Sequence, residues 1–428
     1  MVRSGSRGLI RFRQPPLSWT ACGILIAVGV VSTAAVMLGS WRPTMENTDF
    51  AQDYASAKAW NANVDPYGDT PTLVVRYVGK KIATWPYPYT NPHPPVQILT
   101  AEPFQLLPFR IANAIWTLLM AGAFSAAIWI LFRQLGVSRL GSFTLAIGSL
   151  ALPTVRFSLK NGEPNALALL LIVMAWSNLK RGRQGKAGAA LGLAAALRVF
   201  PILLIVPLLR KRMTRAASYM LVTAASVSVA SVLAFGHLGD FVHSVKDNEM
   251  YWRGAGHNIS LISIPFRWLT PNPWFRHQTN LHAVATVLAI VLALACLAAM
   301  FATPARMSQD VLWAAVPWMI LATPLAWADY LIIAIPCVAL MLVRNKANAG
   351  RFVLTLIIST LILIGRPYYI FNVNPVSVAT QVLGLALPMY GLLGLGLLEW
   401  LPSRKNAIGS AAHPIVFDPT GVTQDADR

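Results

Sequence analysis

The sequence predicts an all-α polytopic membrane protein, and three observations support this fold class. Of the 428 residues, 56% are hydrophobic and only 12% are charged, whereas soluble domains carry about 25% charged residues. Several apolar runs reach the ~20 residues that a helix needs to cross a bilayer. The basic residues lie in short tracts between these runs, as they do in the cytoplasmic loops of membrane proteins. The net charge of +19 therefore indicates topology, and we expect no nucleic-acid partner.

The apolar runs define the expected spans. The first, Trp19 to Leu38, lacks a small-residue cleavage site and continues into an aromatic and charged segment, so we interpret it as a retained span rather than a signal peptide. Further runs are Ala112 to Phe132, Ala216 to Phe235 and Val284 to Phe301. We predict about 11–13 transmembrane helices, some broken or re-entrant, in a single integral domain over residues 1–405. The polar tail 406–428 is expected to be cytoplasmic and disordered.

Charge asymmetry predicts the orientation. If the N-terminus, with Arg3 to Arg13, lies in the cytoplasm, most acidic residues fall on the opposite side. The external loops are then residues 41–110 and 236–282, and both termini are cytoplasmic. The remaining basic tracts fall on the cytoplasmic side: Arg133 with Arg139, Lys180–Lys186, Arg210–Arg215, Arg306, Arg344–Arg351, and Arg404 with Lys405.

Two segments do not fit as single straight spans. Ala187 to Leu209 has basic tracts at both ends and carries Arg198 and Pro201 near its middle, so we expect two half-length helices that meet at Arg198–Pro201. Val311 to Val343 is expected to fold back around Thr323–Asp329 in the same way. Irregular backbone at membrane depth is tolerated where it lines a cavity, and a buried charge there indicates function. The simpler alternative is a proline kink with an arginine that reaches the interface.

Two aspartates follow the first span. Asp49 and Asp53 are four residues apart, so they would share one face of a helix. Partial desolvation would raise the pKa of such a carboxyl group and suit it to take a proton from a bound hydroxyl. The spacing alone also fits a helix N-cap or a solvated charge. The Pro- and aromatic-rich run at residues 87–95 cannot be regular structure and predicts a rigid wall near the headgroups, where interfacial anchoring is the simpler role.

No metal or cofactor site is expected. Histidines 243, 257, 277 and 282 match no compact ligand spacing, and scattered loop histidines usually serve as interfacial polar groups. Cys22, Cys296 and Cys337 lie in apolar segments and predict no disulfide framework. There is also no glycine-rich motif at a strand–helix junction that would bind a nucleotide.

Six short elements occur in an order that resembles glycosyltransferase family 87, a family with the GT-C membrane fold. This family includes the mycobacterial polyprenol-phosphate-mannose-dependent mannosyltransferases of phosphatidylinositol mannosides and lipoglycans, and a related arabinofuranosyltransferase. The resemblance covers the chain from Asp49 to about Pro336. The elements are Asp49-Phe50 with Tyr54 and Asp65-Pro66-Tyr67, then Asn91-Pro92-His93-Pro94-Pro95, Asn161-Gly162-Glu163-Pro164-Asn165, Arg198-Val199-Phe200-Pro201, Asn258-Ile259-Ser260, and Thr323-Pro324-Leu325-Ala326-Trp327-Ala328-Asp329.

The resemblance implies inverting transfer of a sugar, mannose by default, from a polyprenyl-phosphate donor to a hydroxyl of a lipid-linked or cell-envelope glycan. The reaction would take place on the extracytoplasmic face of a bacterial cell membrane. The family's catalytic base corresponds to Asp49. A buried Arg198 could bind the donor phosphate. The expected substrate-binding residues are Asp53, Tyr54, Tyr89, His93, Glu163, Asn165, His257, Asn258, Trp327 and Asp329.

Departures from the family pattern leave the substrates open. His93 replaces the usual Tyr, Arg198 replaces a Lys, and Asp329 stands where many relatives carry His. Glu163 and Ile259 replace glutamines. A different sugar, such as arabinofuranose, or a different acceptor is therefore an alternative. Broken helices with central charges are also typical of secondary transporters and lipid flippases, although no repeat is visible here. A non-catalytic assembly subunit is the third alternative.

Overall fold

The computed structural model describes residues 18–39, 49–79, 89–272, 279–302, 310–363 and 387–400. Across these ranges the regular elements are helices and no strand occurs, which confirms the all-α fold class. Several predictions concern residues outside the described ranges, namely the basic N-terminal segment, His277, Arg306, Arg404, Lys405 and the tail 406–428.

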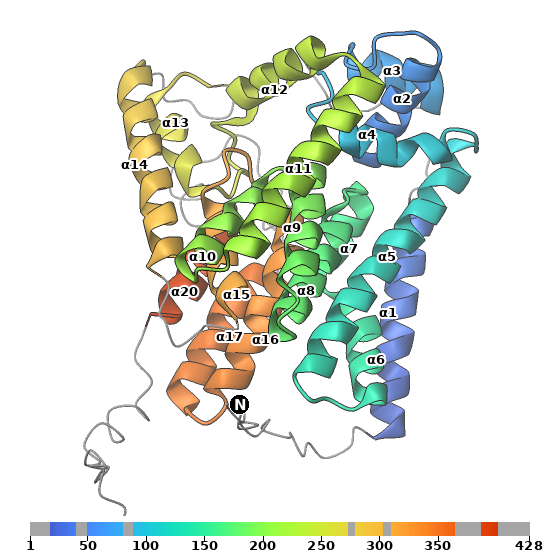
Figure 1. Cartoon of the computed structure of the whole chain (residues 1–428). Coiled ribbons are helices and arrows are strands. Elements are labelled where there is room, and N and C mark those ends of the chain that lie inside the picture. The colour runs from blue at the N-terminus through green and yellow to red at the C-terminus, as the bar shows by residue number, and fades with distance from the viewer. Residues whose placement is uncertain are drawn as a thin grey trace, which may run out of the picture.

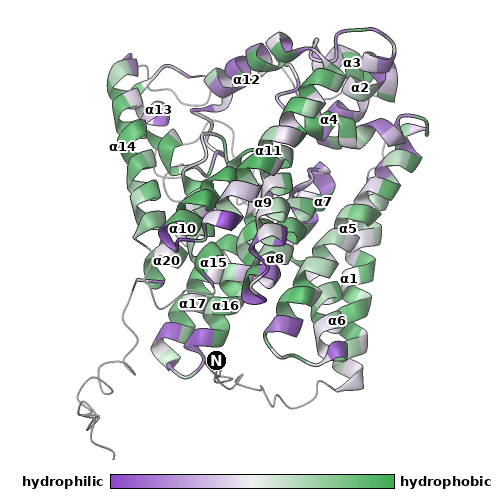
Figure 2. Ribbon diagram, viewed as in Figure 1, coloured by the Kyte–Doolittle hydropathy of each residue, from purple (hydrophilic) through white to green (hydrophobic). Residues whose placement is uncertain are grey.

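Five described helical segments are long and apolar enough to cross a membrane, so the chain is a multi-pass membrane protein (Figures 1 and 2). Shorter apolar helices pack among them. The total of 11–13 spans remains a prediction, because the apolar stretch 364–386 lies outside the described residues. The spans are α1 (Trp19–Gly39), α5 (Phe109–Gln134), α11 (Thr214–Phe235), α14 (His282–Phe301) and the arm Ala328–Asn345. The shorter helices are α8 (Asn165–Lys180), α15 (Val311–Leu321), α17 (Ala349–Leu363) and α20 (Leu387–Leu398).

The two predicted external loops contain helices that gather at one end of the bundle. Figure 1 shows α12 crossing this end, near the tops of α11 and α14, with the helices of the first loop beside it. The connection from α5 to α6 and the connection from α16 to α17 lie at the opposite end. The first loop holds α2 (Asp49–Asn61), α3 (Thr70–Val78), α4 (Pro95–Ala101) and the 3-10 helix η1 (Glu102–Phe104), and the second holds α12 (Leu238–Trp252), η4 (Leu261–Ser263) and α13 (Ile264–Leu269).

The first predicted break is confirmed at Val199. Helix α9 (Gln184–Arg198) ends there, because Val199 takes a φ of 55°, a left-handed value that a β-branched residue rarely adopts. The chain continues as η3 (Phe200–Leu204) and α10 (Ile205–Arg210). Gly188 and Gly192 let α9 approach the backbone of α11 closely, since a Cβ at Gly192 would lie 2.6 Å from the Met220 carbonyl oxygen. Small residues four positions apart permit this kind of packing in membranes.

The second predicted break is confirmed between α15 and η6 (Ala328–Ala334), which continues as α16 (Ile335–Asn345). Its two arms differ in length, contrary to the expected pair of half-length helices. At 1.5 Å per residue α15 is only ~16 Å long. The 3-10 geometry of η6 rises ~2 Å per residue, so η6 and α16 together reach ~30 Å, enough to span the bilayer.

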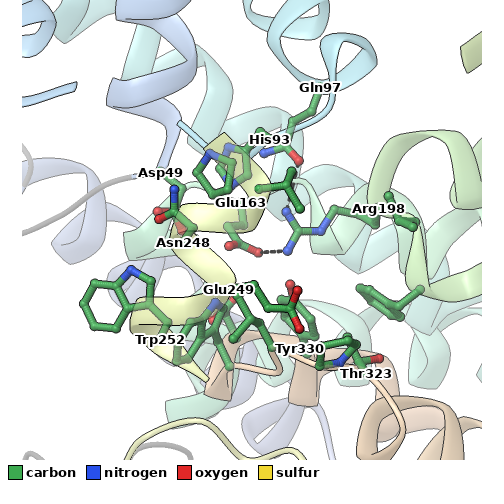
Figure 3. A pocket seen from close by; sticks show the side chains of 18 of the residues that line it. Asp49, His93, Gln97, Glu163, Arg198, Asn248, Glu249, Trp252, Thr323 and Tyr330 are labelled. Carbon is green, nitrogen blue, oxygen red and sulfur yellow. Dashed lines mark hydrogen bonds and ion pairs between the residues drawn. The ribbon is translucent and has the colours of Figure 1, made fainter. Parts of the chain in front are cut away.

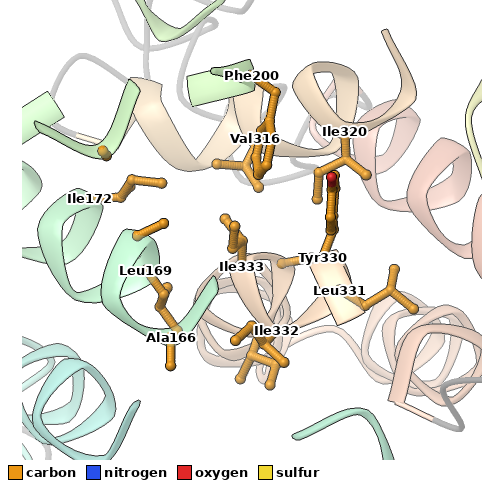
Figure 4. Close-up of a cluster of buried hydrophobic side chains, with 14 of the residues drawn as sticks. Ala166, Leu169, Ile172, Phe200, Val316, Ile320, Tyr330, Leu331, Ile332 and Ile333 are labelled. Atoms are coloured by element: carbon orange, nitrogen blue, oxygen red, sulfur yellow. The ribbon is translucent and has the colours of Figure 1, made fainter. Parts of the chain in front are cut away.

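A third break was not predicted. Helix α6 (Arg139–Gly148), followed by η2 (Ser149–Ala151), meets α7 (Pro153–Asn161) at 68°. Leu152 precedes a proline and takes extended backbone angles, as steric clash with the ring requires. The breaks at Val199 and after α15 border one apolar cluster, in which Leu169 and Ile172 of α8 lie near Phe200, Val316 and Ile333 (Figure 4). This cluster fixes the broken elements relative to one another.

Candidate active site

One cavity of about 670 Å³ lies where the first external loop, the breaks at Val199 and after α15, and helix α12 meet. Its wall is mostly apolar. The polar part includes four carboxylates, of Asp49, Glu163, Glu249 and Asp329, and one guanidinium, of Arg198 (Figure 3). Asp329 is 1% exposed and Glu163 4%. Ionised groups buried to this degree need partners, and the structure provides them.

Arg198 and Glu163 form a buried ion pair through Nη2 and Oε2 (Figure 3). Arg198 Nη1 also donates to the side-chain carbonyl of Gln97 at 3.0 Å. The guanidinium lies over the ring of Tyr330, 4.9 Å from its centroid, and Tyr330 stacks on Phe200 at 4.7 Å. The break at Val199 therefore places the Arg198 guanidinium in the cavity, where Glu163, Gln97 and Tyr330 hold it.

Asn165 joins the second broken segment to this pair. Its amide nitrogen donates to Glu163 Oε2 at 2.8 Å and to Asp329 Oδ2 at 2.7 Å. Asn165 begins α8, and Glu163 follows Gly162, the left-handed residue (φ 74°) that ends α7. The turn at Gly162 thus aims the Glu163 carboxylate at both Arg198 and Asn165.

Asp49 begins α2 and accepts a hydrogen bond from Gln52 Nε2 at 2.6 Å. Its position follows from Phe50, which stacks on Trp116 at 4.8 Å and packs against Gly162. The indole of Trp116 in turn donates to the Gly162 carbonyl at 2.6 Å. Desolvation, reinforced by the negative charge of Asp329, raises the pKa of Asp49 to about 7. A carboxylate with such a pKa is suited to general-base work near neutral pH.

Asp53 lies one turn further along α2 and is 2% exposed. It contacts His93 Nδ1 at 2.7 Å and accepts from Asn91 and from Gln97 Nε2 at 2.9 Å. Because Gln97 also accepts from Arg198, one amide joins the Asp53–His93 pair to the cationic centre. Asp53 therefore orients residues of the cavity wall.

The sequence-predicted residues divide into two groups. One group lines the cavity: Asp49, Tyr89, His93, Glu163, Arg198, His257, Trp327 and Asp329. The other four are not among the residues that line the cavity, and direct contact with substrate stays a prediction for them. Asp53 and Asn165 orient neighbours, as described. Tyr54 donates to the Leu107 carbonyl at 2.7 Å within the aromatic core, and the Asn258 amide contacts the backbone of Pro324 and Ala326.

Several cavity residues were missed by sequence reasoning. Gln97, Asn248, Trp252 and Tyr330 line the cavity, but none belongs to a charged motif. Tyr330 carried the best available signal, because it directly follows Asp329 at a break that was predicted. Trp252 ends a helix whose position over the cavity is set by tertiary contacts alone.

Asp49, His93 and Glu163 could also hold a cation, since one ligand atom of each lies within 4.8 Å of the others. Asp53 at His93 Nδ1 would leave Nε2 for a metal, the usual arrangement around a metal-bound histidine. Glu163, however, already pairs with Arg198, and Arg198 supplies positive charge at this point. The expectation that no metal is required therefore stays a prediction.

The arrangement combines a carboxylate suited to take a proton, a buried guanidinium and a large apolar cavity at one end of a membrane bundle. It can deprotonate a hydroxyl and stabilise an anionic leaving group. The family model of glycosyltransferase family 87 matches residues 89–324, more than half of the chain. Asp49, Trp327 and Asp329 lie outside the matched range. A search of the curated proteins found no match. On the strength of the family match, the chain belongs to glycosyltransferase family 87 and is a glycosyltransferase.

Proposed function

We propose that this glycosyltransferase transfers a sugar from a polyprenyl-phosphate donor to a hydroxyl of a lipid-linked or cell-envelope glycan, with inversion. Asp49 is the general base and Arg198 stabilises the leaving phosphate. The observation that carries the proposal is the placement of Asp49 and Arg198 on the wall of one cavity, with the pKa of Asp49 raised to about 7.

The proposed step is a single displacement. The acceptor oxygen attacks the anomeric carbon and loses its proton to Asp49, while the bond from that carbon to the phosphate oxygen breaks. The electron pair leaves with polyprenyl phosphate, whose new negative charge is stabilised by Arg198. Charge-assisted donors in a desolvated site are effective at stabilising such a leaving group. One displacement inverts the configuration of the transferred sugar.

Arg198 must serve both Glu163 and the donor. A guanidinium has five N–H donors, and the contacts with Glu163 and Gln97 use one nitrogen each. The Arg198 Nε is buried without a hydrogen-bond partner, so donor capacity remains. The phosphate would bind this edge or displace Glu163, whose carboxylate keeps its bond from Asn165.

The location of the cavity supports a lipid-linked donor. Phe200, Ile202 and Leu203 form part of its apolar wall beside Arg198, where a prenyl chain could enter from the bilayer. The basic residues Arg344, in the last turn of α16, and Lys346, just after it, lie at the end of the bundle opposite α12 (Figure 1). By the positive-inside rule this end is cytoplasmic, which supports an extracytoplasmic active site in a bacterial cell membrane. No cofactor takes part in the proposed reaction.

The test is transfer of radiolabel by the purified protein in liposomes. Three donors are compared, namely polyprenyl-phosphate mannose, polyprenyl-phosphate arabinofuranose and a nucleotide-linked mannose. We expect labelled glycolipid with one of the polyprenyl donors, and the identity of that donor decides between mannose and arabinofuranose. Label transferred from the nucleotide sugar alone would refute the proposed donor class.

A further inference from the structure

A wall of aromatic rings lines part of the same cavity. It consists of Tyr89, Trp252, His257 and Trp327, which come from three separate stretches of the chain and are all half-buried. His257 stacks on Trp327 with ring centroids 5.0 Å apart, and Trp252 meets both rings edge-on at 5.5 and 5.8 Å. Tyr89 meets Trp252 edge-on at 6.4 Å. These contacts make one continuous surface, which we call the aromatic wall.

Two sets of hydrogen bonds hold the wall in place before any substrate binds. Next to Tyr89, the Thr90 hydroxyl donates to Ser244 of α12 at 2.8 Å, and Asn248 donates to the Thr90 carbonyl at 2.8 Å. These bonds fix α12, and therefore Trp252, against the Tyr89 segment. Next to His257, the Asn258 amide nitrogen donates to the Pro324 carbonyl at 3.0 Å.

Further hydrogen bonds fix the His257 and Trp327 segments relative to each other. The Asn258 side-chain carbonyl accepts from the Ala326 amide at 3.0 Å, and the Ile259 amide donates to the Ala326 carbonyl at 2.7 Å. His257 and Trp327 are each adjacent to residues in these bonds. A preformed surface loses little conformational entropy on binding, which favours recognition.

The wall lies on the Asp49 side of the cavity. Tyr89 of the wall and Asp49 line the same cavity, and they lie close enough for the charge of Asp49 to act on the Tyr89 hydroxyl. In Figure 3 Asp49 and Trp252 lie toward one side of the cavity and Arg198 toward the other. A ring packed on the wall would therefore present its hydroxyls to the proposed base, while the donor phosphate occupies the Arg198 side.

We propose that the aromatic wall is the acceptor subsite and that it selects an acceptor whose reacting hydroxyl belongs to a saturated ring, such as a sugar or cyclic polyol. This inference rests on the proposed function. The C–H faces of such a ring pack on aromatic faces, whereas the polar groups Asn248 and Glu249 of α12 line the same cavity and can bond to ring hydroxyls. A linear polyol offers the hydroxyls without a flat apolar face. The aromatic wall should therefore distinguish a cyclic acceptor from a linear one.

The test measures binding, without a donor and without turnover. Methyl α-mannoside and mannitol are compared as probes by saturation-transfer NMR with the purified full-length protein in detergent. We expect methyl α-mannoside to bind and mannitol to bind at least tenfold more weakly. Trp252→Ala should weaken methyl α-mannoside about 10- to 100-fold, as loss of a large apolar contact does, and Trp252→Phe should restore most of it. Trp129→Ala, which removes an exposed tryptophan of α5 outside the cavity, is the matched control.

The outcomes separate this inference from the proposed donor chemistry. Equal binding of the two probes, or a Trp252→Ala protein with an unchanged melting temperature and unchanged methyl α-mannoside binding, would overturn the acceptor subsite. Polyprenyl-phosphate mannose should leave the methyl α-mannoside signal in place, and its displacement would show that the wall binds the donor sugar instead. If the probe binds as expected but no polyprenyl donor supports transfer, the subsite stands and the proposed donor fails.

Discussion

The ion pair of Arg198 and Glu163 offers the most informative perturbation. Both side chains are 4% exposed, so solvent screens their charges little. Removing one member of such a buried pair leaves the other charge uncompensated, and this typically costs about 3–5 kcal/mol of stability. We expect Arg198→Met and Glu163→Gln each to lose an amount in this range. Methionine keeps an apolar stem near Tyr330, and glutamine keeps an acceptor for Asn165.

The double variant should recover much of that loss, because neither charge is then left alone. We expect a coupling energy of about 2–3 kcal/mol between the two positions. The assay is reversible unfolding in mixed micelles, followed by tryptophan fluorescence, for the native protein, both single variants and the double variant. Additive losses would show that the pair is not coupled and would refute this reasoning.

Activity of the double variant gives the second half of the test. If Arg198 binds the donor phosphate in addition to pairing with Glu163, the double variant should fold yet transfer sugar at least 100-fold more slowly. Losses in this range are found when one hydrogen-bond donor that stabilises a developing charge is removed. Transfer at the native rate by a folded double variant would limit Arg198 to a structural role.

Three further predictions follow from the site. Because a protonated Asp49 cannot accept a proton and its pKa is raised to about 7, kcat/KM should fall about tenfold per pH unit as the pH decreases below 7; a flat profile from pH 5 to 8 would contradict this. Gly162→Ala should destabilise the fold by about 1–2 kcal/mol because Gly162 has a left-handed φ of 74°. A further loss should come from a clash with Phe50, whose Cβ would lie 2.8 Å from the new methyl group. Thermal unfolding measures the total loss, and Gly239→Ala, where a Cβ meets nothing within 4 Å, is the control. Transfer should survive EDTA, and a loss restored by Mn²⁺ would instead assign a cation to Asp49, His93 and Glu163.

The sequence identified the parts of the fold that depend on composition and charge. Apolar runs predicted α1, α5, α11 and α14, and conflicts between basic tracts predicted the breaks at Val199 and after α15, all of which the structure confirms. The break before Pro153 was not predicted, because a proline inside an apolar run can kink a helix, end it or leave it nearly straight. Here the outcome is a bend of 68°, and it depends on packing against other helices.

The site was predictable where residues were charged and lay at breaks or beside spans. Asp49, Glu163, Arg198 and Asp329 were singled out, and all four line the cavity. Gln97 was not singled out, because a neutral amide in a short helix has no distinctive pattern until its contacts with Asp53 and Arg198 are known. Conversely, Tyr54, Asp53, Asn165 and Asn258 lie in the motifs but are not among the residues that line the cavity. A sequence motif identifies residues that act together, but it does not show which of their side chains line the cavity.

The proposed mechanism requires that Asp49 accept the proton of the attacking hydroxyl. The most direct measurement is transfer by Asp49→Asn, compared with the native protein, using purified polyprenyl-phosphate sugar and acceptor. Asparagine keeps the shape and the contact with Gln52, so we expect native-like unfolding and donor binding with transfer reduced at least 100-fold, the lower range for loss of a general base. Robust transfer by the folded Asp49→Asn variant would show that Asp49 is not the general base.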